Sequence, residues 1–347
     1  MSVAILNGDC RAMLKTLPDE SVHCVVTSPP YFGLRDYGVA GQIGLEPTPD
    51  AFVAEMVAVF REVRRVLRSD GTLWLNLGDS YAQSEIRHRQ GQEGSTLRDG
   101  AIKADEAWAN GTAQTGRRVK HGLKPKDLIG IPWRVAFALQ ADGWWLRQDI
   151  IWSKPNPMPE SVTDRCTKAH EYVFMLTKAA RYYYDAEAIK EPMSLSSVER
   201  LSQDVESQTG SDRVPGKTNG TMKAVGKIDK QRGHGRRHAG FNDRWDAMEK
   251  AEQCTGLRNK RSVWTVATQP FSEAHFATFP PDLIEPCIKA GCPSGGTVLD
   301  CFGGAGTTGL VADRLGRNAI LIELNPEYAA MAERRIKSDA GMFAEVA

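Results

Sequence analysis

The segment from Val298 to Gly309 constrains the fold of this chain more than any other. The apolar pair Val298 and Leu299 predicts the end of a buried strand, and four glycines follow before a helix can begin. A strand, a glycine-rich turn and a helix start, in this order, are typical of the nucleotide-binding unit of open α/β sheets. Glu323 ends the next apolar run, about 20 positions later, where an acidic residue is suited to bind ribose hydroxyls. The sequence therefore predicts an α/β fold with a nucleoside-cofactor site at this turn.

A second strand-ending motif lies near the amino terminus. The run from His23 to Val26 reads as a buried strand, and it stops at the sequence Thr-Ser-Pro-Pro-Tyr because two prolines cannot continue it. Open α/β sheets bind ligands at the carboxyl ends of their strands, so Ser28 and the Pro29 carbonyl are candidate site groups. Pro30 holds the following backbone, and the Tyr31 ring can serve as a flat platform for a planar substrate. Alone, the motif fits an ordinary strand-ending loop with a packed tyrosine about equally well.

Together, the two motifs resemble those of the beta-class amino DNA methyltransferases, which carry Ser/Asp-Pro-Pro-Tyr before Phe-x-Gly-x-Gly and use S-adenosylmethionine. The matching segments, about residues 3–81, 127–187 and 262–338, make up roughly two thirds of the chain. The resemblance implies an α/β fold with a Rossmann-like, doubly wound, largely parallel sheet of the class I methyltransferase type. It also implies a permuted strand order and an inserted recognition region. The chain departs from the family at Cys301 and Ala305, where Pro and Ser are common.

The resemblance implies a role for each of several residues. The implied catalytic residues are Ser28, Pro29, Pro30 and Tyr31. The implied contacts to S-adenosylmethionine are Asp9, His275, Phe276, Thr278, Asp300, Phe302, Gly304, Gly306, Thr307 and Glu323. Candidate DNA contacts are Arg35, Lys154, Arg232, Arg236 and Arg237. For Asp9, a helix-capping role is an equally good interpretation.

Length and charge predict how the chain is organised. A chain of 347 residues can form one α/β domain with a smaller insertion. We expect a catalytic half at 1–187, with a mobile loop at about 83–126, a basic insert at 188–261 and a cofactor-binding half at 262–347. The net charge of only +1 means that any DNA-binding surface must come from local clustering. Residues 213–237 hold eight Lys or Arg against a single Asp, although a solvated linker would have the same composition.

The cysteines and the lengths of the apolar runs predict the cellular compartment of the protein. Seven cysteines form no Cys-x-x-Cys pair and no zinc-like set with histidines, so we expect reduced thiols and no metal. The chain has no run of about 18 apolar residues and no export signal, which predicts a cytoplasmic protein without a membrane span.

The predicted activity is methyl transfer from S-adenosylmethionine to an exocyclic amino nitrogen of a flipped base in double-stranded DNA. Cytosine N4 is favoured, because the Thr-Ser-Pro-Pro-Tyr form resembles the cytosine-N4 group; adenine N6 is the alternative. An inactive DNA-binding regulator and an RNA substrate are two further alternatives. This function leaves two other partners open. One is a second copy of the chain in a homodimer, and the other is a cognate restriction nuclease on a separate chain.

Two details of secondary structure are also expected. Pro132 suits the first turn of a helix whose buried face would contain Trp133, Phe137 and Leu139. The three tyrosines at 182–184 are expected to form a short strand.

Overall fold

The computed structural model describes residues 2–34, 36–82, 123–202, 255–269, 278–340 and 345–346. The chain divides into two compact units, one made of Met1–Ala188 with Arg261–Ala347 and the other of Ile189–Lys260. Within the described ranges, no helix is long and apolar enough to cross a membrane.

The first unit is built on a nine-stranded sheet with the strand order β11-β1-β10-β9-β2-β3-β5-β4-β8. The strands are β1 (Ser2–Asn7), β2 (Val22–Thr27), β3 (Leu67–Leu77), β4 (Trp145–Ser153), β5 (His170–Thr177), β8 (Val263–Thr265), β9 (Thr297–Asp300), β10 (Asn318–Glu323) and β11 (Glu345–Val346). Among these strands, only β5 runs antiparallel to its neighbours, β3 and β4. The predicted largely parallel α/β sheet is therefore confirmed.

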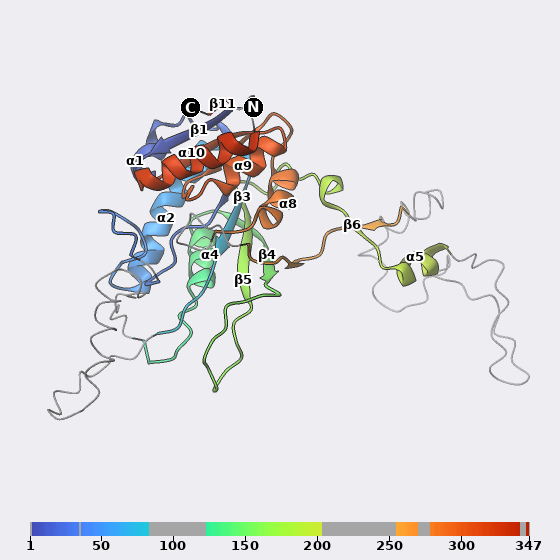
Figure 1. Ribbon diagram of the computed structural model, residues 1–347, viewed down its shortest axis with the longest axis horizontal. Coiled ribbons are helices and arrows are strands. Elements are labelled where there is room, and N and C mark those ends of the chain that lie inside the picture. The colour runs from blue at the N-terminus through green and yellow to red at the C-terminus, as the bar shows by residue number, and fades with distance from the viewer. Residues whose placement is uncertain are drawn as a thin grey trace, which may run out of the picture. The chain divides into compact units, whose positions relative to one another are not determined.

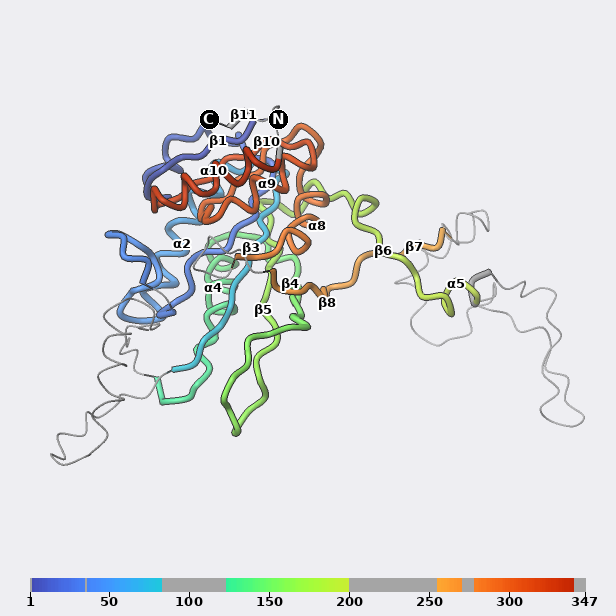
Figure 2. The backbone as a smooth tube through the Cα atoms, viewed as in Figure 1, coloured from blue at the N-terminus to red at the C-terminus, as the bar shows by residue number. Residues whose placement is uncertain are grey.

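The strand order is permuted relative to the chain. β9 and β10 come from the last quarter of the sequence, yet they lie between β1 and β2. Figure 2 shows this as blue strand β1 beside red strand β10. The register pairs Asn7 with Glu323 and Val25 with Leu299. The two predicted motifs thus end adjacent parallel strands, β2 and β9, at the same edge of the sheet.

Helices cover both faces of the sheet, as a doubly wound fold requires. They are α1 (Cys10–Met13), η1 (Leu14–Thr16), α2 (Pro49–Val66), α4 (Ile131–Ala141), η2 (Glu187–Ile189), α8 (Pro281–Gly291), α9 (Thr307–Arg314) and α10 (Pro326–Ala340). α2 packs against α4 and β3, whereas α8, α9 and α10 pack on one another and on the central strands. Figure 1 shows α8 to α10 grouped together in orange and red, apart from blue α2 and green α4.

The longest helix of this unit shows how the sequence positions these layers. The Thr48 hydroxyl accepts a hydrogen bond from Ala51 N at 3.1 Å and caps α2, and Pro49 takes the first helical position. Its apolar stripe, which includes Phe52, Met56 and Phe60, is buried in the main core. Burial of that stripe, rather than helix propensity alone, holds α2 on the sheet.

Two expectations about secondary structure were wrong. Helix α4 begins with Ile131 and Pro132 as expected, but it buries Val135, Ala136 and Leu139, and Phe137 is 55% exposed. Residues 182–184 form no strand. Tyr183 N instead donates to Asp70 O at 2.8 Å, and the Tyr184 ring stacks near Trp74. Aromatic packing against the sheet replaces strand pairing there.

The second unit is described only in part. β6 (Glu191–Pro192) pairs antiparallel with β7 (Leu257–Arg258), and α5 covers Leu195–Ser202. Arg258 Nε lies 2.9 Å from Glu191 Oε1, so an ion pair supports this two-stranded ladder. The candidate DNA contacts Arg232, Arg236 and Arg237 lie outside the described residues.

Candidate active site

A buried hydrogen-bond network joins the two motifs where β2 and β9 end. Thr27 Oγ1 donates to Asp300 Oδ1 at 2.6 Å, and Thr308 Oγ1 donates to Asp300 Oδ2 at 2.6 Å. Phe302 N also donates to Oδ1, at 3.1 Å. Burial raises the pKa of Asp300, which is 1% exposed, and these hydrogen bonds oppose that rise. The Asp300 carboxylate thus holds the glycine-rich turn against the proline corner, and its predicted cofactor contact stays a prediction.

Glu323 lies against the glycine-rich turn at the end of β10. Its Oε2 accepts from Gly304 N at 2.7 Å, and its Oε1 accepts from Asn325 N at 2.9 Å. A carboxylate oxygen has two lone pairs, so each oxygen can still accept a ribose hydroxyl. Burial raises the pKa of Glu323, and the hydrogen bonds from the two backbone N–H groups partly offset this rise.

The glycines of the turn have different physical roles. Gly304 has φ +50°, and a Cβ added there would meet, among the residues that the structure describes, only Phe302 O at 3.9 Å, so these residues leave the space beside it open. Gly306 has φ +75°, and a Cβ there would lie 2.7 Å from Ala332 Cβ in α10. Gly306 therefore permits close helix packing. The Thr307 hydroxyl is buried and accepts from Arg335 Nη1 at 2.9 Å.

The open side of Gly304 and the Glu323 carboxylate fit a nucleoside cofactor. The turn leaves room for a ligand to approach the backbone, and the carboxylate beside it can accept ribose hydroxyls. The predicted contacts of Gly306 and Thr307 with the cofactor stay predictions, because packing already explains both residues.

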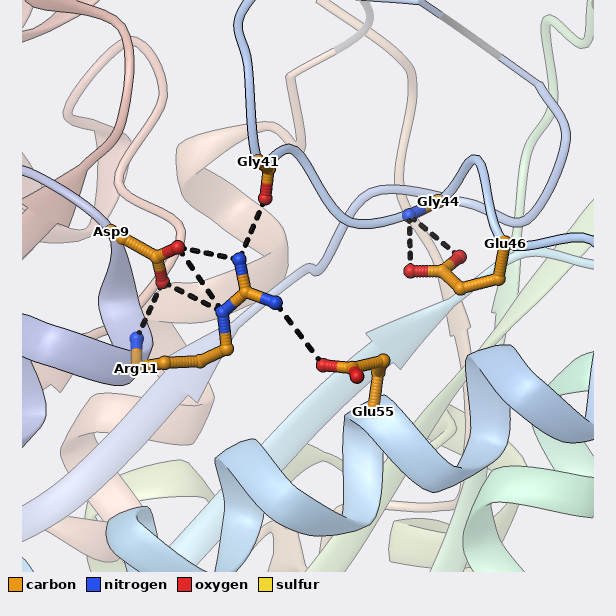
Figure 3. A network of polar contacts seen from close by, with 6 residues as sticks. All are labelled: Asp9, Arg11, Gly41, Gly44, Glu46 and Glu55. Atoms are coloured by element: carbon orange, nitrogen blue, oxygen red, sulfur yellow. Dashed lines mark hydrogen bonds and ion pairs between the residues drawn. The ribbon is translucent and has the colours of Figure 1, made fainter.

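Asp9 belongs to the polar network shown in Figure 3. Its Oδ1 accepts from Arg11 N at 2.8 Å and caps α1, which is the alternative role considered for this residue. Arg11 also forms an ion pair with Asp9 at 2.5 Å and with Glu55 at 3.2 Å, and donates to Gly41 O at 2.8 Å. This ion pair lowers the pKa of Asp9. Since Gly8 N donates to Glu323 O at 2.9 Å, Asp9 lies near the cofactor turn, and its cofactor contact stays a prediction.

The Tyr31 side chain is held on three sides beside the proline corner. Its ring packs on the backbone at the end of β3, since a Cβ added at Gly78 would lie 2.4 Å from Tyr31 Cε2. Its hydroxyl donates to Glu171 Oε2 at 2.6 Å, with Asn76 Oδ1 at 3.4 Å. Burial and the Glu171 charge raise the pKa of Tyr31 well above its usual value, and a hydrogen bond from Ser28 opposes this. Pro29 is buried, whereas Ser28 is partly exposed.

Lys154 has an internal partner. Its ammonium forms an ion pair with Glu171, and the two side chains are 17% and 15% exposed. The same ammonium lies 4.2 Å from the centre of the Trp152 ring. The contact of Lys154 with DNA therefore stays a prediction.

The structure describes only some of the other predicted site residues. Thr278 is half-buried and lies two residues before Pro280, the N-cap of α8. The residues Arg35, His275 and Phe276 lie outside the described ranges. Among the residues that are described, no group of three or more His, Cys, Asp or Glu could hold a metal ion.

Sequence reasoning missed Asn76, Gly78 and Glu171. Two of them could have been found, because a polar residue inside an apolar strand needs a partner: Asn76 interrupts Leu73–Leu77, and Glu171 precedes an apolar run in β5. Gly78 had no such signal, since its importance depends on where the Tyr31 ring packs.

Comparison with known proteins identifies the family. A family model described as DNA methylase, for N6 and N4 methyltransferases, matches residues 22–334. The chain belongs to this DNA methylase family. The Type II methyltransferase M.SmaI of Serratia marcescens is 44% identical over 336 residues, which covers 96% of this chain and 91% of the relative. M.Cfr9I of Citrobacter freundii is 42% identical over 335 residues, which covers 96% and 88%.

Solved structures support the fold of this DNA methylase. A putative DNA modification methylase of Thermus thermophilus, complexed with S-adenosyl-L-methionine, has a TM-score of 0.54 at 22% identity and covers 99% of each chain. The cytosine-N4-specific PvuII DNA methyltransferase has a TM-score of 0.53 at 20% identity, covering 98% of this chain and 92% of that one. The chain is thus a DNA methyltransferase by family, and it has the class I methyltransferase fold.

The position of Glu323 leads to a prediction about cofactor binding. Glu323→Ala should weaken S-adenosylmethionine binding by about 2 kcal/mol, or roughly 30-fold in Kd, because hydrogen bonds to a charged acceptor are lost. Affinity of the native chain should also begin to fall at a pH above about 4.3, the ordinary pKa of a glutamate, because burial raises the pKa of this carboxylate. Titration calorimetry measures both effects, with exposed Glu327→Ala as the control. Unchanged affinity in Glu323→Ala would remove Glu323 from the site.

Proposed function

We propose that the chain is a site-specific Type II methyltransferase that modifies the exocyclic amino nitrogen of a flipped base in double-stranded DNA, with cytosine N4 as the target. The observation that carries this proposal is the junction of the Ser28 corner and the glycine-rich turn through the Thr27–Asp300 hydrogen bond. The names of the Type II relatives support site specificity. The Thr-Ser-Pro-Pro-Tyr form of the corner favours cytosine over adenine.

Ser28 and Pro29 provide the chemistry at the base. An amino nitrogen on an aromatic ring shares its lone pair with the ring, so it must become more tetrahedral before it can attack a methyl group. If the Ser28 hydroxyl and the Pro29 carbonyl accept its two hydrogens, the lone pair points out of the ring plane. S-adenosylmethionine, when bound, supplies a methyl group activated by its sulfonium. The partly exposed Ser28 hydroxyl is accessible to a base that enters from solvent.

Tyr31 would hold the flipped base. The target amino group lies inside the duplex, so the base must leave the stack before it can reach Ser28. An aromatic face replaces part of the lost stacking energy and accepts either pyrimidine or purine rings. The packing of the Tyr31 ring against Gly78 keeps this face in a single orientation.

The basic segment at 213–237 would supply phosphate contacts. Replacing Arg232, Arg236 and Arg237 together by glutamine should weaken DNA binding for all sequences and make it less dependent on salt, because fewer counterions are released. The check is the slope of log affinity against log salt. The control replaces Lys15, Lys289 and Lys337, which carry the same charge elsewhere on the chain. If affinity and slope both match the control, this segment is a solvated linker.

A labelling experiment tests the proposed activity. Purified protein is incubated with methyl-tritiated S-adenosylmethionine and unmethylated genomic DNA, which is then digested to nucleosides and separated. We expect the label in N4-methyldeoxycytidine. Label in N6-methyladenine would shift the target to adenine, label only in an RNA control would change the polymer, and no transfer would favour the inactive regulator.

A further inference from the structure

A chain of polar contacts leads away from the Tyr31 hydroxyl. It passes from Tyr31 to Glu171 in β5 and then to Lys154, just after β4. Asn76 in β3 completes the cluster, because its Nδ2 donates to Glu171 Oε2 at 3.3 Å and to Tyr172 O at 3.0 Å. The cluster thus joins the proline corner to three strands that contribute no other group to the proposed chemistry.

The ion pair in this cluster is costly to bury. Glu171 and Lys154 are 15% and 17% exposed, and desolvation of two charges offsets most of their mutual attraction. Apolar side chains of similar size would stabilise the fold as well or better. Fold stability alone is therefore a weak explanation for this ion pair. A role in orienting Tyr31 explains it better, because the Tyr31 hydroxyl needs a hydrogen-bond acceptor at this position.

The contacts on Tyr31 fix both ends of its ring. Pro30 restrains the backbone at one end, and Glu171 accepts from the hydroxyl at the other. Gly78 supports the ring in between. A ring held in this way loses little conformational freedom when a base stacks on it, so the flipped state costs less to form.

We propose that Glu171 is a positioning residue for the target base, which it serves by holding the Tyr31 ring as a preformed stacking surface. The ion pair with Lys154 keeps the Glu171 carboxylate oriented. Lys168 is a further charged group close to Glu171, and its ammonium donates a hydrogen bond to Asp79 O at 2.7 Å. This inference rests on the proposed function only in taking Tyr31 as the stacking surface, and it holds whichever base is methylated.

A double-mutant cycle tests the proposal. Tyr31→Phe keeps the ring and removes the hydroxyl, and the pair Glu171→Leu with Lys154→Met removes the acceptor without leaving an unpaired charge. Each change should lower the flipped fraction of a fluorescent base analogue, and the single-turnover rate, about 10-fold. All three substitutions together should do no more than Tyr31→Phe alone. Glu171→Gln should keep most of the flipping, because its amide oxygen still accepts from Tyr31.

Controls separate this role from others. The S-adenosylmethionine Kd should match the native chain in every variant, since the cofactor turn is not altered. The slope of DNA affinity against salt should match it in Tyr31→Phe and Glu171→Gln, which leave the candidate DNA contact Lys154 in place. Additive effects in the cycle, or normal flipping in Tyr31→Phe, would overturn the proposal. If the Leu and Met pair fails to fold, Tyr31→Phe and Glu171→Gln still decide it. An inactive native chain would instead mean that the proposed function has failed.

Discussion

Ser28→Ala should slow the methyl-transfer step by about 10² to 10³-fold, because one positioned hydrogen-bond partner of the reacting amino group is lost. The prolines that shape the corner remain. Tyr31 loses its hydrogen bond from Ser28 but keeps the one to Glu171. Cofactor and DNA should therefore bind with native affinity. Single-turnover methylation at saturating DNA measures the chemical step directly, and Ser338→Ala on the exposed side of α10 is the matched control.

Tyr31→Ala should reduce the rate for a different reason. It removes a stacking contact worth about 1 to 3 kcal/mol and lowers the fraction of complexes in which the base is flipped. A fluorescent base analogue at the target should report poor flipping in Tyr31→Ala and near-native flipping in Ser28→Ala. Native single-turnover rates in folded Ser28→Ala would place the active site at another corner of the sheet.

Asp300→Ala should destabilise the fold by about 2 to 4 kcal/mol. The change removes the acceptor for the hydroxyls of Thr27 and Thr308 and for Phe302 N, and leaves these groups unpaired in the core. Asp300→Asn is the matched control, because it keeps the shape and one oxygen acceptor at lower desolvation cost. Urea unfolding compares the variants. Equal stability of Asp300→Ala and the native chain would show that this network does not hold the two motifs together.

The native chain and Asp300→Asn, compared at different pH values, also test the pKa of Asp300. Burial raises that pKa in the folded state, so the folded chain binds this proton more tightly than the unfolded chain does. The stabilisation from the proton is fully present below the unfolded pKa and is lost as the pH rises through the folded one. The native chain should therefore gain stability relative to Asp300→Asn as the pH falls towards about 4, the ordinary pKa of an aspartate. If the difference in unfolding free energy between the two proteins did not change with pH, it would contradict a raised pKa for the buried Asp300 carboxyl.

The sequence predicted the sheet well because its signals are local. Apolar runs that end at Val26 and at the glycine-rich turn predict buried strands. The order of the two motifs carries the resemblance to the family, which implies the permutation that places β9 beside β2. In helix α2 the capping residue Thr48, Pro49 and the apolar stripe agree, so the signals for this helix are local as well.

What sequence alone could not show is which neighbour a side chain meets. Phe137 is exposed although it lies on an apolar helix, because α4 packs through another face, which carries Val135, Ala136 and Leu139. Asp9 was interpreted as a cofactor contact or, equally, a helix cap, and Gly306 as a cofactor contact. A helix cap and helix packing account for the contacts observed, and both cofactor contacts stay predictions. Glu171 was missed because its meaning comes from Tyr31, 140 positions away in the chain.

Nucleoside mass spectrometry of DNA from cells that produce the native chain, or its Ser28→Ala variant, tests the central claim most directly. The claim is that the Ser28 corner methylates the amino nitrogen of cytosine in DNA. We predict N4-methyldeoxycytidine in DNA from cells with the native chain and little or none with Ser28→Ala at equal expression. N6-methyladenine in its place would contradict the choice of base, and equal N4-methyldeoxycytidine in both samples would contradict the assigned corner.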